Sequence, residues 1–146
     1  MNQKIKFGVV GLGHIGIRHA KCILDNKFAE LTTVFDLLPK NKWRVDASCD
    51  KANSFKELIQ QDLDVVSICT PNYLHANMAI DVLRADKHVV IEKPMAISTE
   101  DAQNIIDTAA SYNKLVFCVM QNRFSPSMIW LKEIISKGYL GKINMV

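Results

Sequence analysis

The sequence has 146 residues, of which 49% are hydrophobic and 23% are charged, so it can build one globular domain and is too short for two. The formal net charge is only +3 and the basic residues are spread along the chain, which argues against a nucleic-acid partner. The amino terminus lacks a secretory pattern and no apolar run approaches the ~20 residues that span a bilayer, so we expect a cytoplasmic protein without a membrane partner.

Short apolar runs alternate with helix-like patterns along the chain. In chain order we expect a strand over 4–10, a helix over 15–24, a strand over 31–35, helical segments over 40–47 and 54–60, a strand over 63–69, a helix over 73–84, a strand over 87–91, a helix over 98–112, a strand over 115–120 and a helix over 125–137. Ser54 and Ser98 stand where two of these helices begin and are typical N-caps. The last six residues, GKINMV, are typical of the start of one more strand.

The expected strands are apolar throughout rather than alternating, which is typical of strands that are covered on both faces by helices. The order of strands and helices therefore predicts an α/β fold, a Rossmann-type, doubly wound and mostly parallel sheet. We assign residues 1–124 to this domain and residues 125–146 to a helix and the start of a strand.

Three glycines, Gly11, Gly13 and Gly16, form the pattern G-x-G-x-x-G between the first expected strand and the first expected helix. In a dinucleotide site the first glycine permits a tight turn, the second lets the backbone approach a pyrophosphate, and the third allows close packing of helix on strand. The backbone N–H groups of His14 and Ile15 would then face the phosphates. The alternative is a tight turn that binds no ligand.

Asp36 ends the second expected strand about 20 residues after Gly16, where a carboxylate can accept hydrogen bonds from both hydroxyls of the adenosine ribose. A carboxylate there would repel a 2′-phosphate, and no arginine follows at once, so the sequence favours NAD over NADP. Lys40 and Lys42 leave an alternative open, because they could approach a 2′-phosphate. A solvated helix face is the other interpretation of these two lysines.

Four motifs, GLGHIG, CTPNYLH, IEKP and QNRF, occur in this order along the chain. Together they resemble the amino-terminal half of the Gfo/Idh/MocA oxidoreductases, the glucose-fructose oxidoreductase and inositol dehydrogenase family. The resemblance implies hydride transfer between NAD and a sugar or cyclitol hydroxyl. It also implies a second domain, an antiparallel sheet with a catalytic Asp and His, that this chain lacks. We therefore expect the chain to bind NADH without turning over a substrate.

By the same resemblance, Lys93 is the catalytic residue, which bonds the reacting hydroxyl or assists its proton transfer. Pro94 is expected to follow a cis peptide bond, and Glu92 to contact the nicotinamide ribose or to hold the lysine ammonium. The position agrees with a general rule, because ligands of open α/β sheets bind beyond the carboxyl ends of the strands. The alternative is a surface Glu-Lys pair that ends a strand.

Other residues gain roles from the resemblance. Thr70, Pro71 and Asn72 are expected to line the ribose and nicotinamide side of the cofactor. Asn122 and Arg123 are expected to complete the cofactor and substrate pocket; the alternative for the guanidinium is a salt bridge to a nearby acid. The remaining expectations concern three histidines: His75 either contacts the ligand or makes a structural hydrogen bond, whereas His19 and His88 are interpreted as ordinary helix and strand residues.

The resemblance extends to a branch of the family that oxidises the C3 hydroxyl of a UDP-linked N-acetylhexosaminuronic acid, and other sugars or cyclitols remain open as substrates. In its full-length form the protein is expected to be a homo-oligomer. A non-catalytic dinucleotide-binding or sensing module is the alternative function. The four cysteines make no C-x-x-C pair, so we expect free thiols and no metal site.

Overall fold

The computed structural model describes residues 3–45 and 49–145, and it contains one six-stranded sheet in the order β3-β2-β1-β4-β5-β6. Every neighbouring pair of strands is parallel. The strands are β1 (Ile5–Val10), β2 (Ala29–Phe35), β3 (Asp50–Lys51), β4 (Val65–Ile68), β5 (His88–Ile91) and β6 (Val116–Cys118). This order is that of a doubly wound Rossmann sheet, so the predicted fold class is confirmed.

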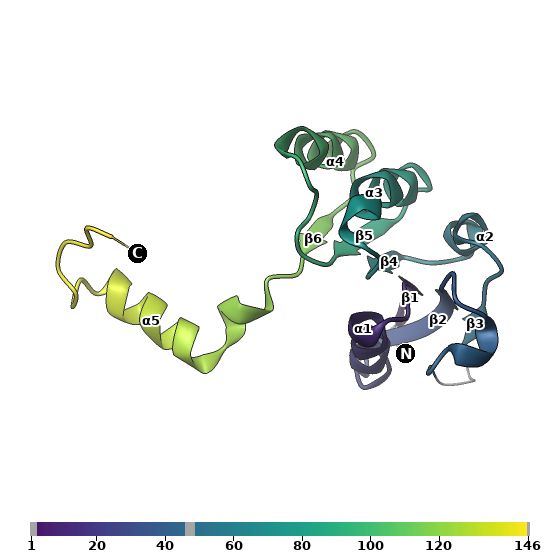
Figure 1. The fold of residues 1–146 in the computed structure, drawn as a ribbon, viewed down its shortest axis with the longest axis horizontal. Helices are drawn as coiled ribbons and strands as arrows, with labels where there is room; N and C mark the ends of the chain where they lie inside the picture. Colours follow the sequence, from purple (N-terminus) through teal and green to yellow (C-terminus); the bar gives the residue numbers. More distant parts are fainter. Residues whose placement is uncertain (1–2, 46–48, 146) are drawn as a thin grey trace.

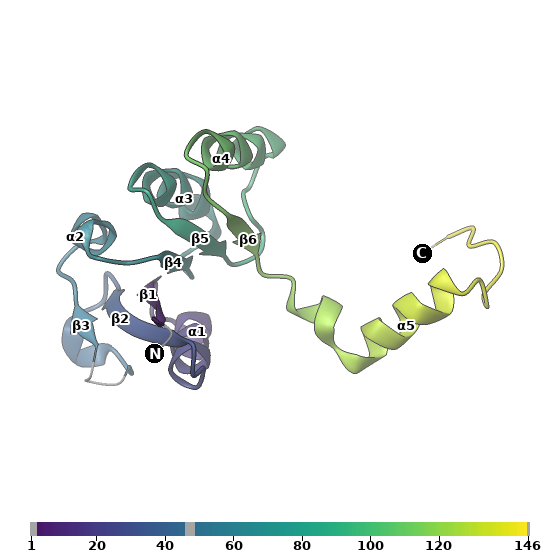
Figure 2. The same ribbon diagram turned by 180° about the vertical axis from the view of Figure 1, so that it is seen from behind.

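Helices lie on both faces of the sheet, with α1 on one face and α3 and α4 on the other, as Figures 1 and 2 show. The α-helices are α1 (His14–Leu24), α2 (Phe55–Gln60), α3 (His75–Arg84), α4 (Thr99–Ser111) and α5 (Pro126–Ser136), and three short 3₁₀ helices are η1 (Lys40–Lys42), η2 (Asn72–Leu74) and η3 (Gln121–Phe124). The hydroxyls of Ser54 and Ser98 accept hydrogen bonds from backbone N–H groups three residues on, which confirms both as N-caps.

Two apolar cores hold the layers together, one on each face of the sheet. On one face Val66, Val89 and Ile91 pack among residues of α2, α3 and α4, including Leu83 and Ile105. On the other face, side chains of β1 and β2 pack against α1; this cluster includes Val9, Leu31, Val34, Ala20 and Ile23. Because consecutive residues of a strand point to opposite faces, the wholly apolar strands supply both cores.

The prediction of a helical segment over 40–47 is wrong. Only Lys40–Lys42 is helical there, as a single 3₁₀ turn, and residues 46 and 47 lie outside the described residues. The reason lies in Trp43, whose side chain is buried in a T-shaped contact with the Phe35 ring and whose Nε1 donates to the Leu38 carbonyl at 2.7 Å. The short strand β3 was not expected, because it carries no apolar run.

After β6 the chain leaves the sheet, and Figure 1 shows α5 projecting away from the other elements. Trp130 on this helix is 62% exposed. The strand expected within GKINMV is not formed over 141–145, where no strand of the described chain lies alongside to pair with it. Among the described residues, no helix combines the length and the apolar character needed to cross a membrane.

Candidate dinucleotide-binding and catalytic site

A groove of about 660 Å³ opens at the carboxyl ends of β1, β2 and β4. Five of the predicted cofactor-binding residues line it: Gly11, Gly13, Asp36, Thr70 and Pro71. Apolar side chains, among them those of Phe35, Phe55, Leu74 and Met78, form the rest of the wall. A largely apolar groove with a few convergent polar groups at this edge of an α/β sheet is the usual setting for a nucleotide.

The three glycines differ in what surrounds them. Gly11 adopts φ +85°, a conformation that other residues rarely take. A Cβ on Gly16 would lie 1.7 Å from the carbonyl oxygen of Gly11, so the third glycine lets α1 pack on the turn. A Cβ on Gly13 would meet no atom of the described chain within 4 Å. The space beside Gly13 is therefore open to a group from outside the chain, which fits the approach of a pyrophosphate.

The first turn of α1 faces the same edge. The helix begins at His14 with Gly13 as N-cap. No side chain of the described residues caps it, and its first turn contains no acidic residue. The amides of His14 and Ile15 belong to this turn, where the helix dipole favours negative charge. Their setting fits the predicted phosphate contact.

Asp36 lies at the end of β2, beside the glycine turn. Its Oδ2 accepts a hydrogen bond from the backbone N–H of Leu12 at 2.5 Å, and its Oδ1 accepts one from Leu38 at 2.7 Å. An ionised carboxylate has about four acceptor positions, so it can still accept from ribose hydroxyls.

The E-K-P turn lies beyond the carboxyl end of β5. The peptide bond between Lys93 and Pro94 is cis, as the family resemblance predicts. Lys93 is exposed and, with Asn122, Arg123 and their neighbours in η3, lines a small depression of about 110 Å³. The fold thus brings together one lysine and two residues that lie about thirty positions further along the chain.

His75 fits the structural role rather than ligand contact. Its side chain is fully buried, with Nδ1 2.7 Å from the Pro94 carbonyl oxygen and Nε2 2.9 Å from that of Thr70. Both ring nitrogens are thereby occupied within the protein. The imidazole ties the start of α3 to both loops of the site. Asn72, by contrast, is exposed in η2 and does not line the groove.

His19 is a functional candidate that the sequence interpretation missed, because it is not an ordinary helix residue. Its Nδ1 lies 2.7 Å from Ser67 Oγ of β4 and its Nε2 lies 3.0 Å from Glu92 Oε1. A signal was present, since His19 follows Gly16 by one helical turn and so lies on the face of α1 that packs on the sheet. Glu92 does not hold the lysine ammonium among the described residues; its Oε2 accepts from the Lys93 backbone N–H at 3.2 Å.

Cys69 directly follows β4 and lines the groove, and burial raises the pKa of its thiol to about 12. A hydrogen bond with Ser67 partly offsets this effect, whereas the nearby charge of Glu92 adds to it. The side chain therefore stays a neutral thiol at physiological pH and is a poor nucleophile. In the described part of the chain, no group of three or more His, Cys, Asp and Glu side chains could hold a metal ion.

Residues 5–120 match the family model of the Gfo/Idh/MocA proteins, described as an oxidoreductase family with an NAD-binding Rossmann fold. The chain belongs to this family. As a Gfo/Idh/MocA Rossmann domain it takes NAD as its cofactor, which agrees with the geometry of the glycine turn and Asp36.

Among curated Gfo/Idh/MocA relatives, inositol 2-dehydrogenase of Salmonella paratyphi B is 32% identical over 152 residues, covering 97% of this chain and 44% of the relative. Two solved structures are also similar. The WlbA dehydrogenase of Bordetella pertussis, in complex with NADH and UDP-GlcNAcA, has a TM-score of 0.89 at 31% identity and covers 97% of this chain and 44% of that one. The scyllo-inositol dehydrogenase of Lactobacillus casei, with bound NAD(H) and scyllo-inositol, has a TM-score of 0.85 at 28% identity. This match covers 97% of the present chain and 43% of the Lactobacillus chain. The chain thus spans less than half the length of these relatives.

Proposed function

We propose that the whole protein transfers a hydride between NAD and a hydroxyl group of a sugar or nucleotide sugar. The observation that carries this proposal is the position of Lys93. Its exposed ammonium follows β5 at the carboxyl edge of the sheet and lines one depression with Asn122 and Arg123. A cation in such a place suits a reaction in which an oxygen atom changes its charge.

The cofactor and the protein chain would handle different parts of the reaction, the hydride and the proton. NAD, when bound, accepts the hydride from the carbon that carries the hydroxyl. The chain must handle the proton, and Lys93 would donate a hydrogen bond to the hydroxyl oxygen or pass its proton on. An ammonium group beside that oxygen contributes most in the transition state, where negative charge develops on the oxygen.

Arg123 and Asn122 support a substrate that carries an anionic group. A guanidinium binds a carboxylate or phosphate through two parallel hydrogen bonds, and Arg123 is exposed beside Lys93. The WlbA dehydrogenase, whose structure contains UDP-GlcNAcA, gives a precedent for such a substrate in a similar protein. We therefore propose a UDP-linked N-acetylhexosaminuronic acid first, and a neutral cyclitol as the second candidate.

Asp36 supports a preference for NAD over NADP. Its carboxylate lies in the wall of the groove, fixed by two backbone N–H groups, and would face the 2′ position of the adenosine ribose. The exposed Lys42 is a candidate for an opposing charge near this carboxylate. A fixed negative charge at this place disfavours a 2′-phosphate.

Further expectations concern the whole protein. A second domain would supply the catalytic Asp and His, so residues 1–124 would bind NAD and this chain alone would not turn over a substrate. The full-length form would be a homo-oligomer and cytoplasmic. α5 exposes apolar side chains, among them Ile129 and Trp130, which supports the proposal that another domain or subunit packs against this helix.

The test is an assay of NAD reduction by the full-length protein with a panel of UDP-sugar acids, neutral UDP-sugars and cyclitols. Turnover with a UDP-sugar acid at least tenfold above that with cyclitols is the expected result. A protein that binds NADH but reduces NAD with none of the panel would support the alternative, a non-catalytic dinucleotide-binding module.

A further inference from the structure

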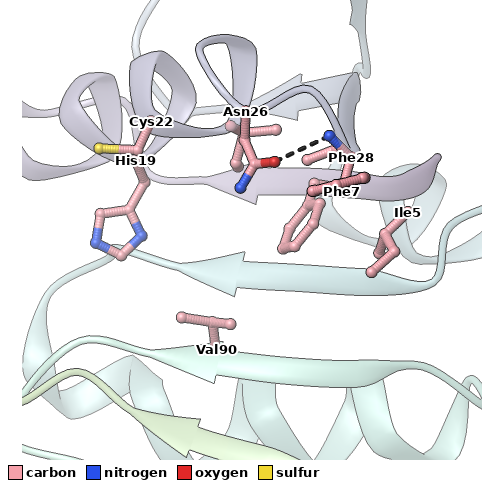
Figure 3. A pocket seen from close by; sticks show the side chains of 9 residues that line it. Ile5, Phe7, His19, Cys22, Asn26, Phe28 and Val90 are labelled. Atoms are coloured by element: carbon pink, nitrogen blue, oxygen red, sulfur yellow. Dashed lines mark hydrogen bonds between the residues drawn. The ribbon is translucent and has the colours of Figure 1, made fainter.

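His19 reaches across the sheet to the turn that carries Lys93. It belongs to α1, whereas its two hydrogen-bond partners are Ser67 of β4 and Glu92, which directly follows β5. Figure 3 shows its ring pointing from α1 toward the strands, at one end of a groove that Val90 also lines. The side chains of His19 and Glu92 are 15% and 13% exposed, so little water competes for their contact.

The contact with Glu92 persists in either charge state of the imidazole. In the neutral ring Nε2–H donates to Glu92 Oε1, and the Ser67 hydroxyl donates to Nδ1. In the charged ring both nitrogens donate, and the Ser67 hydroxyl can turn its proton to Cys69 Sγ, 3.8 Å away. The carboxylate is therefore held by a charge-assisted hydrogen bond from His19 in both cases.

Glu92 passes this anchoring on to Lys93. Its second oxygen, Oε2, accepts from the backbone N–H of Lys93, and the next residue, Pro94, is held through its carbonyl by His75. The backbone is thus fixed on both sides of the lysine. In the described part of the chain, the Lys93 ammonium itself is exposed and forms no ion pair.

We propose that His19 is a positioning residue, which holds the Glu92 carboxylate and thereby sets the place from which Lys93 reaches the reacting hydroxyl. This inference rests on the proposed dehydrogenase function. It assigns His19 no contact with substrate or cofactor. A catalytic group that is displaced by about 1 Å loses on the order of 10²-fold in rate, so the anchor affects turnover more than cofactor affinity.

The test compares His19→Ala, His19→Gln and His88→Gln in the full-length protein. His19→Ala should lower kcat by about 10- to 100-fold, with the NADH dissociation constant within about threefold of the parent. The glutamine amide can donate where Nε2–H donates, so His19→Gln should recover most of the loss. His88→Gln is the matched control, because His88 accepts from Leu115 at the opposite end of β5.

A double-mutant cycle shows whether His19 acts through Glu92. In a Glu92→Ala background, which leaves no side-chain oxygen for His19 Nε2–H to hold, His19→Ala should have little further effect on kcat. Equal losses in both backgrounds would overturn the proposal, as would an unchanged kcat in His19→Ala. The contact has its own readout, since a nitrogen-15 spectrum of the parent chain should show a His19 Nε2–H signal that Glu92→Ala shifts. A shifted signal with no turnover by the parent protein refutes the dehydrogenase and this role together, whereas a shifted signal with an unchanged kcat refutes this role alone.

Discussion

Oδ2 of Asp36 accepts a hydrogen bond from the backbone N–H of Leu12 at 2.5 Å, which joins the end of β2 to the glycine turn of β1. The same carboxylate lies in the groove where the ribose of a dinucleotide would bind. Asp36 therefore has two tasks, to hold the turn and to accept from the cofactor. Changes at this residue test both the site and the proposed preference for NAD.

Replacement of Asp36 by serine should weaken NADH binding by about 1.5–3 kcal/mol, the range for the loss of hydrogen bonds to a charged group. The preference for NADH over NADPH should narrow in the same variant, because the repulsion of the 2′-phosphate is removed. Calorimetric titration with both cofactors measures the two effects. Asp62→Ser is a suitable control, since Asp62 is exposed and pairs with Lys6 away from the groove. Unchanged selectivity in Asp36→Ser would count against the assignment.

Alanine substitutions at two glycines should separate folding from binding. Gly16→Ala forces a Cβ into the Gly11 carbonyl oxygen, and we expect destabilisation of more than about 4 kcal/mol or no folded protein. Gly13→Ala meets open space at an extended N-cap position, so the stability should fall by only about 1 kcal/mol. Its methyl group occupies the proposed pyrophosphate position, so NADH affinity should fall at least about tenfold, or 1.4 kcal/mol. Urea denaturation and calorimetry on the same samples measure both quantities.

Lys93→Met in the full-length protein keeps the bulk of the side chain and removes its charge. If the ammonium acts on the reacting hydroxyl, kcat should fall by ~10²–10⁴-fold, the contribution of a typical acid–base group. NADH affinity should change by less than about tenfold. A kcat of Lys93→Met within a few-fold of the parent value would mean that the E-K-P residues form only a turn and that Lys93 has no catalytic role. Lys21→Met serves as the control, because Lys21 is exposed on α1.

The buried Cys69 thiol should lower the free energy of unfolding at alkaline pH. Its pKa is about 12 in the fold against an ordinary value of 9.0, so above pH 9 the unfolded chain ionises while the folded one does not. The folded state then binds more protons, and its stability falls as the pH rises toward 12. Between about pH 8 and 10 this loss amounts to about 1.4 kcal/mol. Cys69→Ala should lack that part of the loss in urea denaturation, whereas Cys22→Ala, which alters an exposed thiol, should retain it.

Local patterns predicted most of the fold and several of the residues that line the candidate groove. The wholly apolar strands and the serine N-caps depend on neighbouring residues only, and the glycine triplet with Asp36 depends on one strand-helix-strand unit. His19 could not be paired with Glu92 in this way, because the two are brought together only when α1 packs across β4 and β5. The same applies to Trp43, whose burial against Phe35 replaces the expected helix, and to His75, which bonds a carbonyl beyond β5.

We assign the binding of NAD to the groove beside the glycine turn and Asp36. Titration of the 146-residue chain with NADH and with NADPH tests this most directly. We expect saturable binding of one NADH per chain and an affinity for NADPH lower by at least about tenfold, or 1.4 kcal/mol. Absence of NADH binding up to millimolar concentration, or equal affinity for the two cofactors, would contradict it.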